Sequence, residues 1–173
     1  DSLQVLAFAI LARHPGAPAD PAARVRMIAA LADASGTAGM AGGQALDLEA
    51  AGSRLTIAEL EHVHALKTGA LIRASVLMAA ACAPGLLDAR RLALHQFSTA
   101  IGLAFQVQDD ILDVEGDETL IGKPVGSDEA RGLPTYPALV GLEAARERVR
   151  QLHVEAAGAL ATCDWQDGPL AAL

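Results

Sequence analysis

Three aspartates in the second half of the sequence are spaced so that one helix could present them together. Asp109, Asp110 and Asp113 lie in residues 105–113, which read FQVQDDILD. At about 100° per residue, a helix would place these carboxylates and Gln106 within an arc of roughly 100°. Like charges one helical turn apart repel one another, so such a group favours a bound cation. Carboxylate oxygens are the ligands of hard ions such as Mg²⁺, which also bridges to phosphate groups.

The helix that carries these aspartates is predicted to be apolar on most of its other faces. Its polar stripe continues backwards through Gly102, Thr99 and His95, and hydrophobic residues occupy most of the remaining circumference. A helix that is apolar nearly all round is normally buried. We therefore expect the stripe to face an internal cavity. The alternative is a solvated acidic face near a helix end, because short acidic motifs are common.

The elements that must position this stripe are all predicted to be helices. Alanine and leucine are abundant and aromatic residues make up 3%, which favours packed helices over a β-sandwich. Asp20 before Pro21 is a helix-start signal. Thr56 and Glu59 form a capping-box pattern, and Gly69 indicates a break or kink. We expect one all-α domain over residues 1–173, with helices at residues 2–13, 21–34, 38–51, 56–66, 70–83, 88–114 and 135–160.

The charge balance and the apolar runs argue against two classes of partner. The net charge is −8, with 21 acidic and 13 basic residues and no basic block, so no nucleic acid partner is expected. The longest apolar run, residues 5–12, is too short to span a bilayer, and no signal peptide is visible. Cys82 and Cys163 lack the spacing of metal ligands and fit reduced thiols. We expect a cytoplasmic protein with no membrane span.

Four motifs occur in an order and at spacings that resemble the trans-prenyltransferases. Residues 105–113 resemble that family's second aspartate-rich motif, FQxxDDxxD. Residues 43–48 (GQALDL), 67–71 (KTGAL) and 135–139 (TYPAL) resemble its further signatures. Together they identify the chain as similar to the C-terminal part of a short-chain isoprenyl diphosphate synthase, above all to the bacterial farnesyl diphosphate synthases. The resemblance implies an isoprenoid-synthase-type helical bundle around a central cavity, with its N-terminal helices missing here.

The resemblance also implies an enzyme and its chemistry. Members of the family join isopentenyl diphosphate head to tail to an allylic diphosphate, dimethylallyl or geranyl, and here the implied product is farnesyl diphosphate. Mg²⁺ and lysines neutralise the diphosphate as it leaves the allylic carbon. Asp109 is the implied direct Mg²⁺ ligand, and Asp110 and Asp113 bind the ion directly or through its water. A homodimer is implied as well.

Four further residues take implied roles in catalysis or diphosphate binding. Lys67 and Lys123 would contact the allylic diphosphate. Lys67 could instead be a solvated lysine at a helix end, and Lys123 could be a loop residue with no role. Thr68 and Gln106 would direct oxygens toward the developing carbocation, where dipoles stabilise the charge without trapping it covalently.

Three more residues are implied on the substrate side. Gln44 and Asp47 are candidates for diphosphate binding on the facing helix, or they form a simple hydrogen bond within that helix. Phe105 would line the isopentenyl site. His62 and His64 face different sides of their helix and make poor joint ligands, so we expect both histidines at the surface.

The match to the family is incomplete. The family's first aspartate-rich motif and the basic residues that hold isopentenyl diphosphate would lie before Asp1, so the isolated chain is expected to be inactive. Leu133 stands where many relatives carry a diphosphate-binding lysine, a charge that Arg131 could supply. Three alternatives stay open: a geranylgeranyl diphosphate synthase, a non-catalytic partner subunit, and a terpene cyclase or squalene synthase relative. The last class usually lacks this set of motifs.

Overall fold

Helices form every regular element in the described part of the chain, which comprises residues 2–83, 85–115 and 130–172 of this computed structural model. The predicted all-α class is therefore confirmed. The elements are α1 (Ser2–Arg13), α2 (Pro21–Ser35), α3 (Met40–Glu49), α4 (Ile57–His64), the π-helical turn η1 (Ala65–Gly69), α5 (Ala70–Ala81), α6 (Asp88–Glu115), α9 (Tyr136–Val140), α10 (Leu142–Ala161) and the 3₁₀ turn η2 (Pro169–Ala172).

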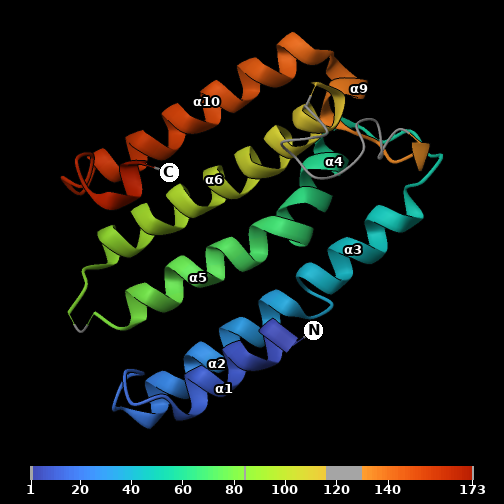
Figure 1. The fold of residues 1–173 in the computed structure, drawn as a ribbon. Coiled ribbons are helices and arrows are strands. Elements are labelled where there is room, and N and C mark those ends of the chain that lie inside the picture. Colours follow the sequence, from blue (N-terminus) through green and yellow to red (C-terminus); the bar gives the residue numbers. More distant parts are fainter. Residues whose placement is uncertain (1, 84, 116–129, 173) are drawn as a thin grey trace.

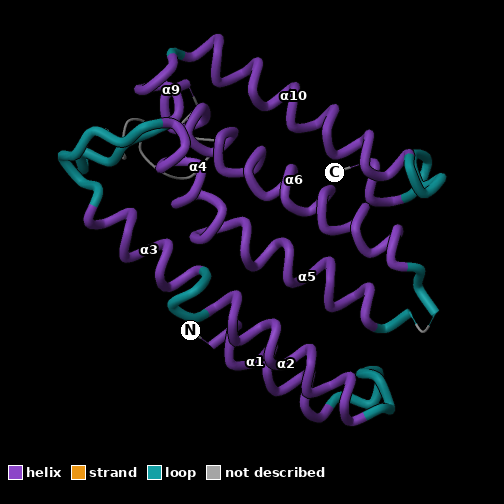
Figure 2. Tube along the Cα trace, turned by 180° about the vertical axis from the view of Figure 1, so that it is seen from behind, coloured by secondary structure: helices purple, strands orange, loops and turns teal. Residues whose placement is uncertain are grey.

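The longer helices lie side by side in a row, with α6 between α10 and α5. Figure 1 shows the order α10, α6, α5 and then the α2–α1 pair, and Figure 2 shows the same row from behind. Neighbours α5 and α6 run antiparallel, as do α6 and α10. α3 leads from the end of α2 toward α4. The C-terminal end of α6, which carries the aspartates, consequently lies beside η1, α4 and α9.

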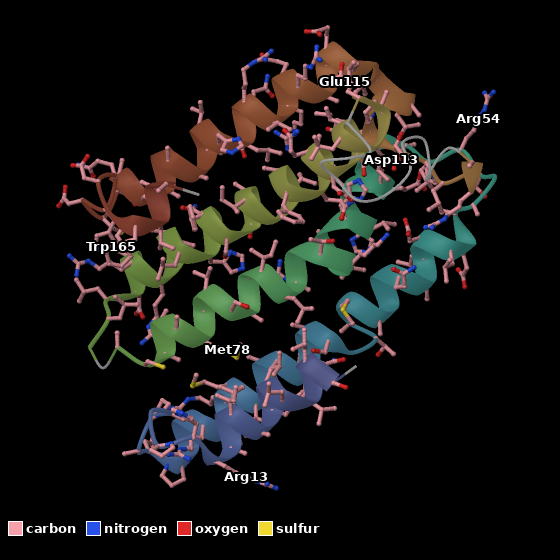
Figure 3. All side chains as sticks on the ribbon, viewed as in Figure 1. Arg13, Arg54, Met78, Asp113, Glu115 and Trp165 are labelled. Carbon is pink, nitrogen blue, oxygen red and sulfur yellow. The ribbon has the colours of Figure 1, made fainter. Side chains whose placement is uncertain are left out.

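Two clusters of buried side chains enclose α6, one toward each end. The N-terminal cluster comprises Phe97, Ala100, Ala104, Leu152, Ala156, Ala159 and Leu160. The C-terminal cluster comprises Leu60, Val107, Ile111, Tyr136, Ala145 and Val149. Figure 3 labels Trp165, which packs on the first cluster, and Asp113, which lies at the other end of the bundle. Burial of this apolar surface is the main favourable term that holds α10 and α4 against α6.

Two predicted helix starts are confirmed by their side-chain hydrogen bonds. Asp20 precedes α2, and its carboxylate accepts hydrogen bonds from the backbone N–H groups of Ala22 and Ala23. Thr56 precedes α4, accepts from the Glu59 N–H, and its own N–H donates to the Glu59 carboxylate. These reciprocal bonds satisfy backbone donors that have no partner within the helix.

Two predicted helix boundaries were wrong. Residues 135–160 do not form one helix, because Gly141 has φ 85° and ψ 157°, a conformation that ends α9 before α10 begins. Gly69 does not break its helix either. The chain instead passes from α4 to α5 through the wide turn η1, so that residues 57–81 are continuously helical.

This continuous helix, Ile57–Ala81, is long and apolar enough to cross a bilayer by length and composition alone, with a mean hydropathy of 1.2. A core helix of a folded protein meets the same criterion. Here the helix packs against α6 and α2 and contains the buried His64. This packing buries 33% of the apolar window within the described part of the chain.

Candidate functional site

The π-turn η1 is held between α3 and α6 by two glycines. A Cβ atom at Gly43 would lie 2.3 Å from the backbone nitrogen of Lys67, and one at Gly102 would lie 2.9 Å from Cα of Gly69. Any larger residue at Gly43 would therefore collide with the main chain of η1. Isolated π-turns within α-helices often occur at functional sites, and this one carries Lys67 and Thr68.

Lys67 and Asp47 form an ion pair on the α3 side of η1. The distance between Nζ of Lys67 and Oδ2 of Asp47 is 2.6 Å. The Asp47 side chain is buried, whereas 29% of the Lys67 side chain is exposed. Two residues predicted from separate motifs thus meet. Gln44, one turn earlier on α3, is exposed and is not brought to this pair.

Thr68 and Gln106 meet on the α6 side of η1. The Thr68 hydroxyl donates to Oε1 of Gln106 at 2.7 Å. The amide nitrogen of Gln106 donates to Asp109 at 3.5 Å and to Oδ1 of Asp110 at 3.3 Å. This arrangement joins the turn that carries Lys67 to the aspartate-rich segment of α6.

Asp110 is turned into the protein and is 3% exposed. Its Oδ2 accepts the backbone N–H of Tyr136 at 2.8 Å and lies 3.1 Å from Nε2 of His64. The surface position expected for His64 was wrong, because this side chain is buried against Asp110. His62 is exposed, as predicted. Among the described residues, Nδ1 of His64 has no hydrogen-bond partner.

A second set of polar residues continues from Tyr136 to the α10 surface. The Tyr136 hydroxyl donates to Glu61 at 2.9 Å, and Arg148 donates to the same carboxylate oxygen at 3.2 Å. Burial raises the pKa of Tyr136, and the hydrogen bond to Glu61 raises it further because ionisation would place two negative charges together. The sequence analysis missed this set, since its members are 75 and 87 positions apart.

The three motif aspartates occupy different surroundings. Asp109 is partly buried and lines a hollow of about 210 Å³ with Phe105, Leu112 and others. Asp113 is 2% exposed and lines a separate hollow of about 570 Å³ beside residues 132–142. No group of three or more His, Cys, Asp or Glu side chains in the described part of the chain is arranged to hold a metal ion by itself.

The remaining predicted residues lie apart from this centre. Phe105 is 62% exposed at the rim of the Asp109 hollow. Arg131 is exposed, and Leu133 lines the hollow beside Asp113. Lys123 lies outside the described residues.

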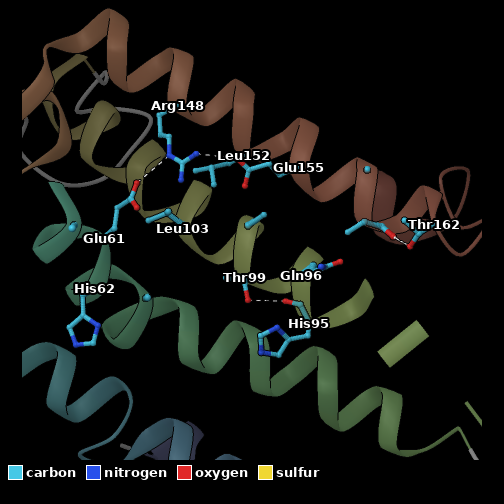
Figure 4. A pocket seen from close by; sticks show the side chains of 15 residues that line it. Glu61, His62, His95, Gln96, Thr99, Leu103, Arg148, Leu152, Glu155 and Thr162 are labelled. Carbon is cyan, nitrogen blue, oxygen red and sulfur yellow. Dashed lines mark hydrogen bonds and ion pairs between the residues drawn. The ribbon is translucent and has the colours of Figure 1, made fainter. Parts of the chain in front are cut away.

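A hollow of about 770 Å³ is a groove between α4 and α10 with α6 as its floor (Figure 4). Glu61 and Arg148 line it near one end, and His95 and Thr99 project into it from α6. Lys67, Thr68 and Asp109 are not among its lining residues. His95 therefore faces this groove, at a distance from the predicted catalytic residues.

Comparison with known proteins relates this arrangement to characterised sequences. The polyprenyl synthetase family model matches residues 1–163. Farnesyl diphosphate synthase of Escherichia coli (strain K12) is 52% identical over 153 residues, which are 88% of this chain and 51% of that protein. Farnesyl diphosphate synthase of Geobacillus stearothermophilus is 45% identical over 158 residues, which are 91% of this chain and 52% of that protein. The chain thus spans about half the length of the curated relatives it matches.

Solved structures share the same arrangement of helices. A geranyltransferase from Helicobacter pylori, crystallised with magnesium and isoprenyl diphosphate, has a TM-score of 0.83 and 31% identity, over 98% of this chain and 54% of that one. An FPP/GFPP synthase from Zymomonas mobilis has a TM-score of 0.77 and 35% identity, over 94% and 53%. The sequence match and the helical fold agree: the chain belongs to the polyprenyl synthetase family.

Proposed function

We propose that the protein containing this chain is an Mg²⁺-dependent prenyltransferase that joins isopentenyl diphosphate to dimethylallyl or geranyl diphosphate and gives farnesyl diphosphate. The observation that carries the proposal is the Thr68–Gln106 hydrogen bond, which joins the turn carrying Lys67 to the segment carrying Asp109. Relatives named farnesyl diphosphate synthase, at 52% and 45% identity, support the choice of reaction and product.

The charges around η1 suit a leaving diphosphate. Lys67 keeps part of its side chain exposed, so its ammonium can turn from Asp47 toward a bound diphosphate. The oxygens of Thr68 and Gln106 present dipoles that stabilise positive charge on the allylic fragment. Asp47 remains behind Lys67 and directs its side chain through their ion pair. Gln44, Phe105 and Lys123 remain proposed substrate contacts.

Mg²⁺, when bound, would neutralise negative charge on the departing diphosphate. This ion commonly takes one or two carboxylates and completes its shell with water and phosphate oxygens, so a ready three-ligand cluster is not required. Asp109 is the best placed ligand because it is partly buried and borders a hollow. Asp110 and Asp113 are buried, so they would act through their charge or through metal-bound water.

The proposal includes a cytoplasmic homodimer. Leu3, Leu6 and Ile10 form an exposed apolar face of α1, which either the rest of the complete protein or a second copy can cover. Exposed apolar patches of this kind are typical of protein interfaces. Size-exclusion chromatography with light scattering on the complete protein measures the state directly, and a monomer would contradict this part of the proposal.

The reaction is tested with the complete gene product, Mg²⁺, labelled isopentenyl diphosphate and either allylic diphosphate. We expect a C15 product that disappears when a chelator removes the metal. A C20 product would instead identify a geranylgeranyl diphosphate synthase, and no product from folded protein would favour a non-catalytic subunit. Residues 1–173 alone are expected to give no product.

Two variants test the proposed residues within that assay. Lys67→Ala and Asp109→Ala should each lower kcat by roughly 100-fold or more, since each removes charge stabilisation of the leaving group. Arg26→Ala and Asp33→Ala are matched controls, because they remove the same charges from exposed positions on α2. Unchanged turnover in both active-site variants would contradict the assignment.

A further inference from the structure

We propose that His64 is a positioning residue for this reaction, which holds Asp110 in place and thereby fixes the orientation of the Gln106 amide. The inference rests on the proposed function for its kinetic consequence, although its structural basis stands on contacts described above. His64 belongs to no motif that pointed to catalysis. Its side chain reaches the aspartate-rich segment at Asp110, where Nε2 lies 3.1 Å from Oδ2.

The register of two antiparallel helices brings His64 to this position. Thr68 of η1 contacts Gln106 of α6. His64 lies four residues before Thr68, and Asp110 lies four residues after Gln106, so one helical turn along each element gives the next contact. The Thr68–Gln106 and His64–Asp110 pairs are therefore two successive contacts across one helix interface, at 2.7 Å and 3.1 Å.

Asp110 is held by donors from three directions. The Tyr136 N–H and His64 share Oδ2, and the Gln106 amide donates to Oδ1. Both side chains of the His64–Asp110 pair are 4% exposed, so water does not replace a lost partner easily. A carboxylate accepts and does not donate, so Nε2 of His64 carries the hydrogen. Loss of His64 would leave Oδ2 with the Tyr136 N–H alone from the described residues.

The orientation of Gln106 depends on Asp110. A glutamine amide has an oxygen on one side and a nitrogen on the other, and either could face Thr68. Asp110 is the nearer acceptor of the nitrogen, at 3.3 Å against 3.5 Å for Asp109, so the oxygen is left to face the Thr68 hydroxyl. In this arrangement the Thr68 hydroxyl oxygen and Oε1 of Gln106 can both stabilise a positive charge on the substrate. His64 thus acts at a distance from the reacting atoms, through Asp110 and then Gln106.

The second ring nitrogen supports a functional interpretation over simple packing. Nδ1 of His64 is buried and has no partner in the described part of the chain. An unpaired buried polar atom opposes folding. An apolar side chain of similar size would fill the space without that penalty, so packing alone does not explain a histidine here. The Nε2 contact with Asp110 does.

The test compares His64→Gln with His64→Leu in the complete gene product. The Gln side-chain amide can donate to Asp110 in place of Nε2, whereas Leu fills the space and donates nothing. We expect His64→Leu to lower kcat by about 10- to 100-fold, as the loss of an outer hydrogen-bond partner does at other sites. KM for both diphosphates should stay within about threefold, because His64 is 3% exposed and acts through Asp110. His64→Gln should recover most of kcat.

His62→Gln and His62→Leu are matched controls, because His62 is exposed two residues away and should leave kcat unchanged. Should His64→Leu not fold, His64→Asn replaces it, since its shorter amide does not reach Asp110. Equal kcat values for His64→Gln and the non-donating variant, or a loss confined to KM, would overturn the proposal.

Amide hydrogen exchange separates this proposal from the proposed function. The Tyr136 N–H donates to Asp110, so its exchange should accelerate at least about tenfold in His64→Leu and return toward the native rate in His64→Gln. A native protein without prenyltransferase activity would refute the proposed function, and the exchange result would still decide whether His64 anchors Asp110. Unchanged Tyr136 exchange in His64→Leu would refute the anchoring itself.

Discussion

Both halves of helix α6 bury one side against other helices, but the buried sides are surrounded by different kinds of side chain. In the N-terminal half, Phe97 and Ala100 pack with Leu152 and Leu160 of α10, and the contacts are apolar. In the C-terminal half, the polar groups Gln106, Asp110 and Asp113 are buried among hydrogen-bond donors and apolar neighbours.

This difference separates what stabilises the fold from what prepares the site. Apolar burial needs no particular partner and contributes roughly 25 cal/mol for each Å² removed from water. A buried hydrogen bond contributes little net stability, but removing one partner leaves the other unsatisfied and lowers the free energy of unfolding. Buried polar groups therefore mainly fix the geometry of their neighbours. We expect substitutions in the first half to change stability alone, and substitutions in the second half to change turnover as well.

The largest loss of stability is expected from Leu160→Ala. Leu160 is 0% exposed in the N-terminal cluster, so its truncation leaves a cavity and should lower the free energy of unfolding by about 2–5 kcal/mol. Denaturant unfolding measures the loss. Turnover per folded molecule should remain native, and a reduced kcat at full folding would break the proposed separation of the two halves.

Compared with Leu160→Ala, Asp110→Asn should lower the free energy of unfolding less and turnover more. The asparagine keeps one carbonyl oxygen for the donors that now share the carboxylate, so at least one buried donor loses its acceptor, at about 1–3 kcal/mol. Turnover should fall together with stability because Gln106 loses its fixed partner. Asp33→Asn is the control, since this exposed carboxylate lies on α2. Native turnover in Asp110→Asn would contradict the comparison.

Asp47→Asn should cost about 1 kcal/mol, because the Lys67 side chain is partly exposed and solvent screens the pair. The loss should shrink at high salt, where the native pair is already weakened. Unfolding measured at two salt concentrations gives both values. A loss that is independent of salt would mean that hydrogen-bond geometry, and not charge, stabilises this side of η1.

Thr56→Ala should destabilise by about 1 kcal/mol, the usual cost of removing a helix N-cap. The capping box lies on the surface, so turnover and salt dependence should remain native. The variant therefore gives the loss of unfolding free energy that a purely local change near α4 produces. A change in kcat here would show that α4 transmits disturbances to the site without any contact.

The smallest effect concerns Tyr136 at high pH. Its pKa is raised in the folded protein above the ordinary value of 10.0, so its stabilising contribution is fully present below pH 10.0. Above that pH the unfolded chain loses the proton first, and the free energy of unfolding falls. Tyr136→Phe should show a shallower decline above about pH 10 in denaturant unfolding. Parallel curves for the two proteins would contradict the assignment.

Local sequence signals predicted most of the helices because the relevant contacts are local. Asp20 and Thr56 bond to backbone groups within three residues, so their roles are visible in the sequence. Gly141 was missed because a lone glycine in an apolar segment does not reveal its φ. The π-turn was missed for a similar reason, since Gly69 indicated an irregularity but not that one wide turn would accommodate it.

The site was only partly predictable. Resemblance to a family brought out Lys67, Thr68 and Gln106, and the structure joins two of these directly. The spacing of the aspartates predicted a shared face, but the burial of each carboxylate depends on which elements pack against it. Asp110 is buried because His64 and the first residue of α9, Tyr136, both contact its carboxylate. The helix register could have revealed His64, because a Thr68–Gln106 contact places residues 64 and 110 one turn further along.

The wide turn η1 also determines the phase between its two flanking helices. A π-turn holds one residue more than an α-helical turn, so every position of α5 is offset by about 100° from where a regular continuation of α4 would put it. A deletion of one residue between His64 and Ala70 would leave both helices intact and rotate the apolar stripe of α5 away from α2. The number of residues in this short stretch is thus a structural requirement of its own, separate from the chemistry of Lys67 and Thr68.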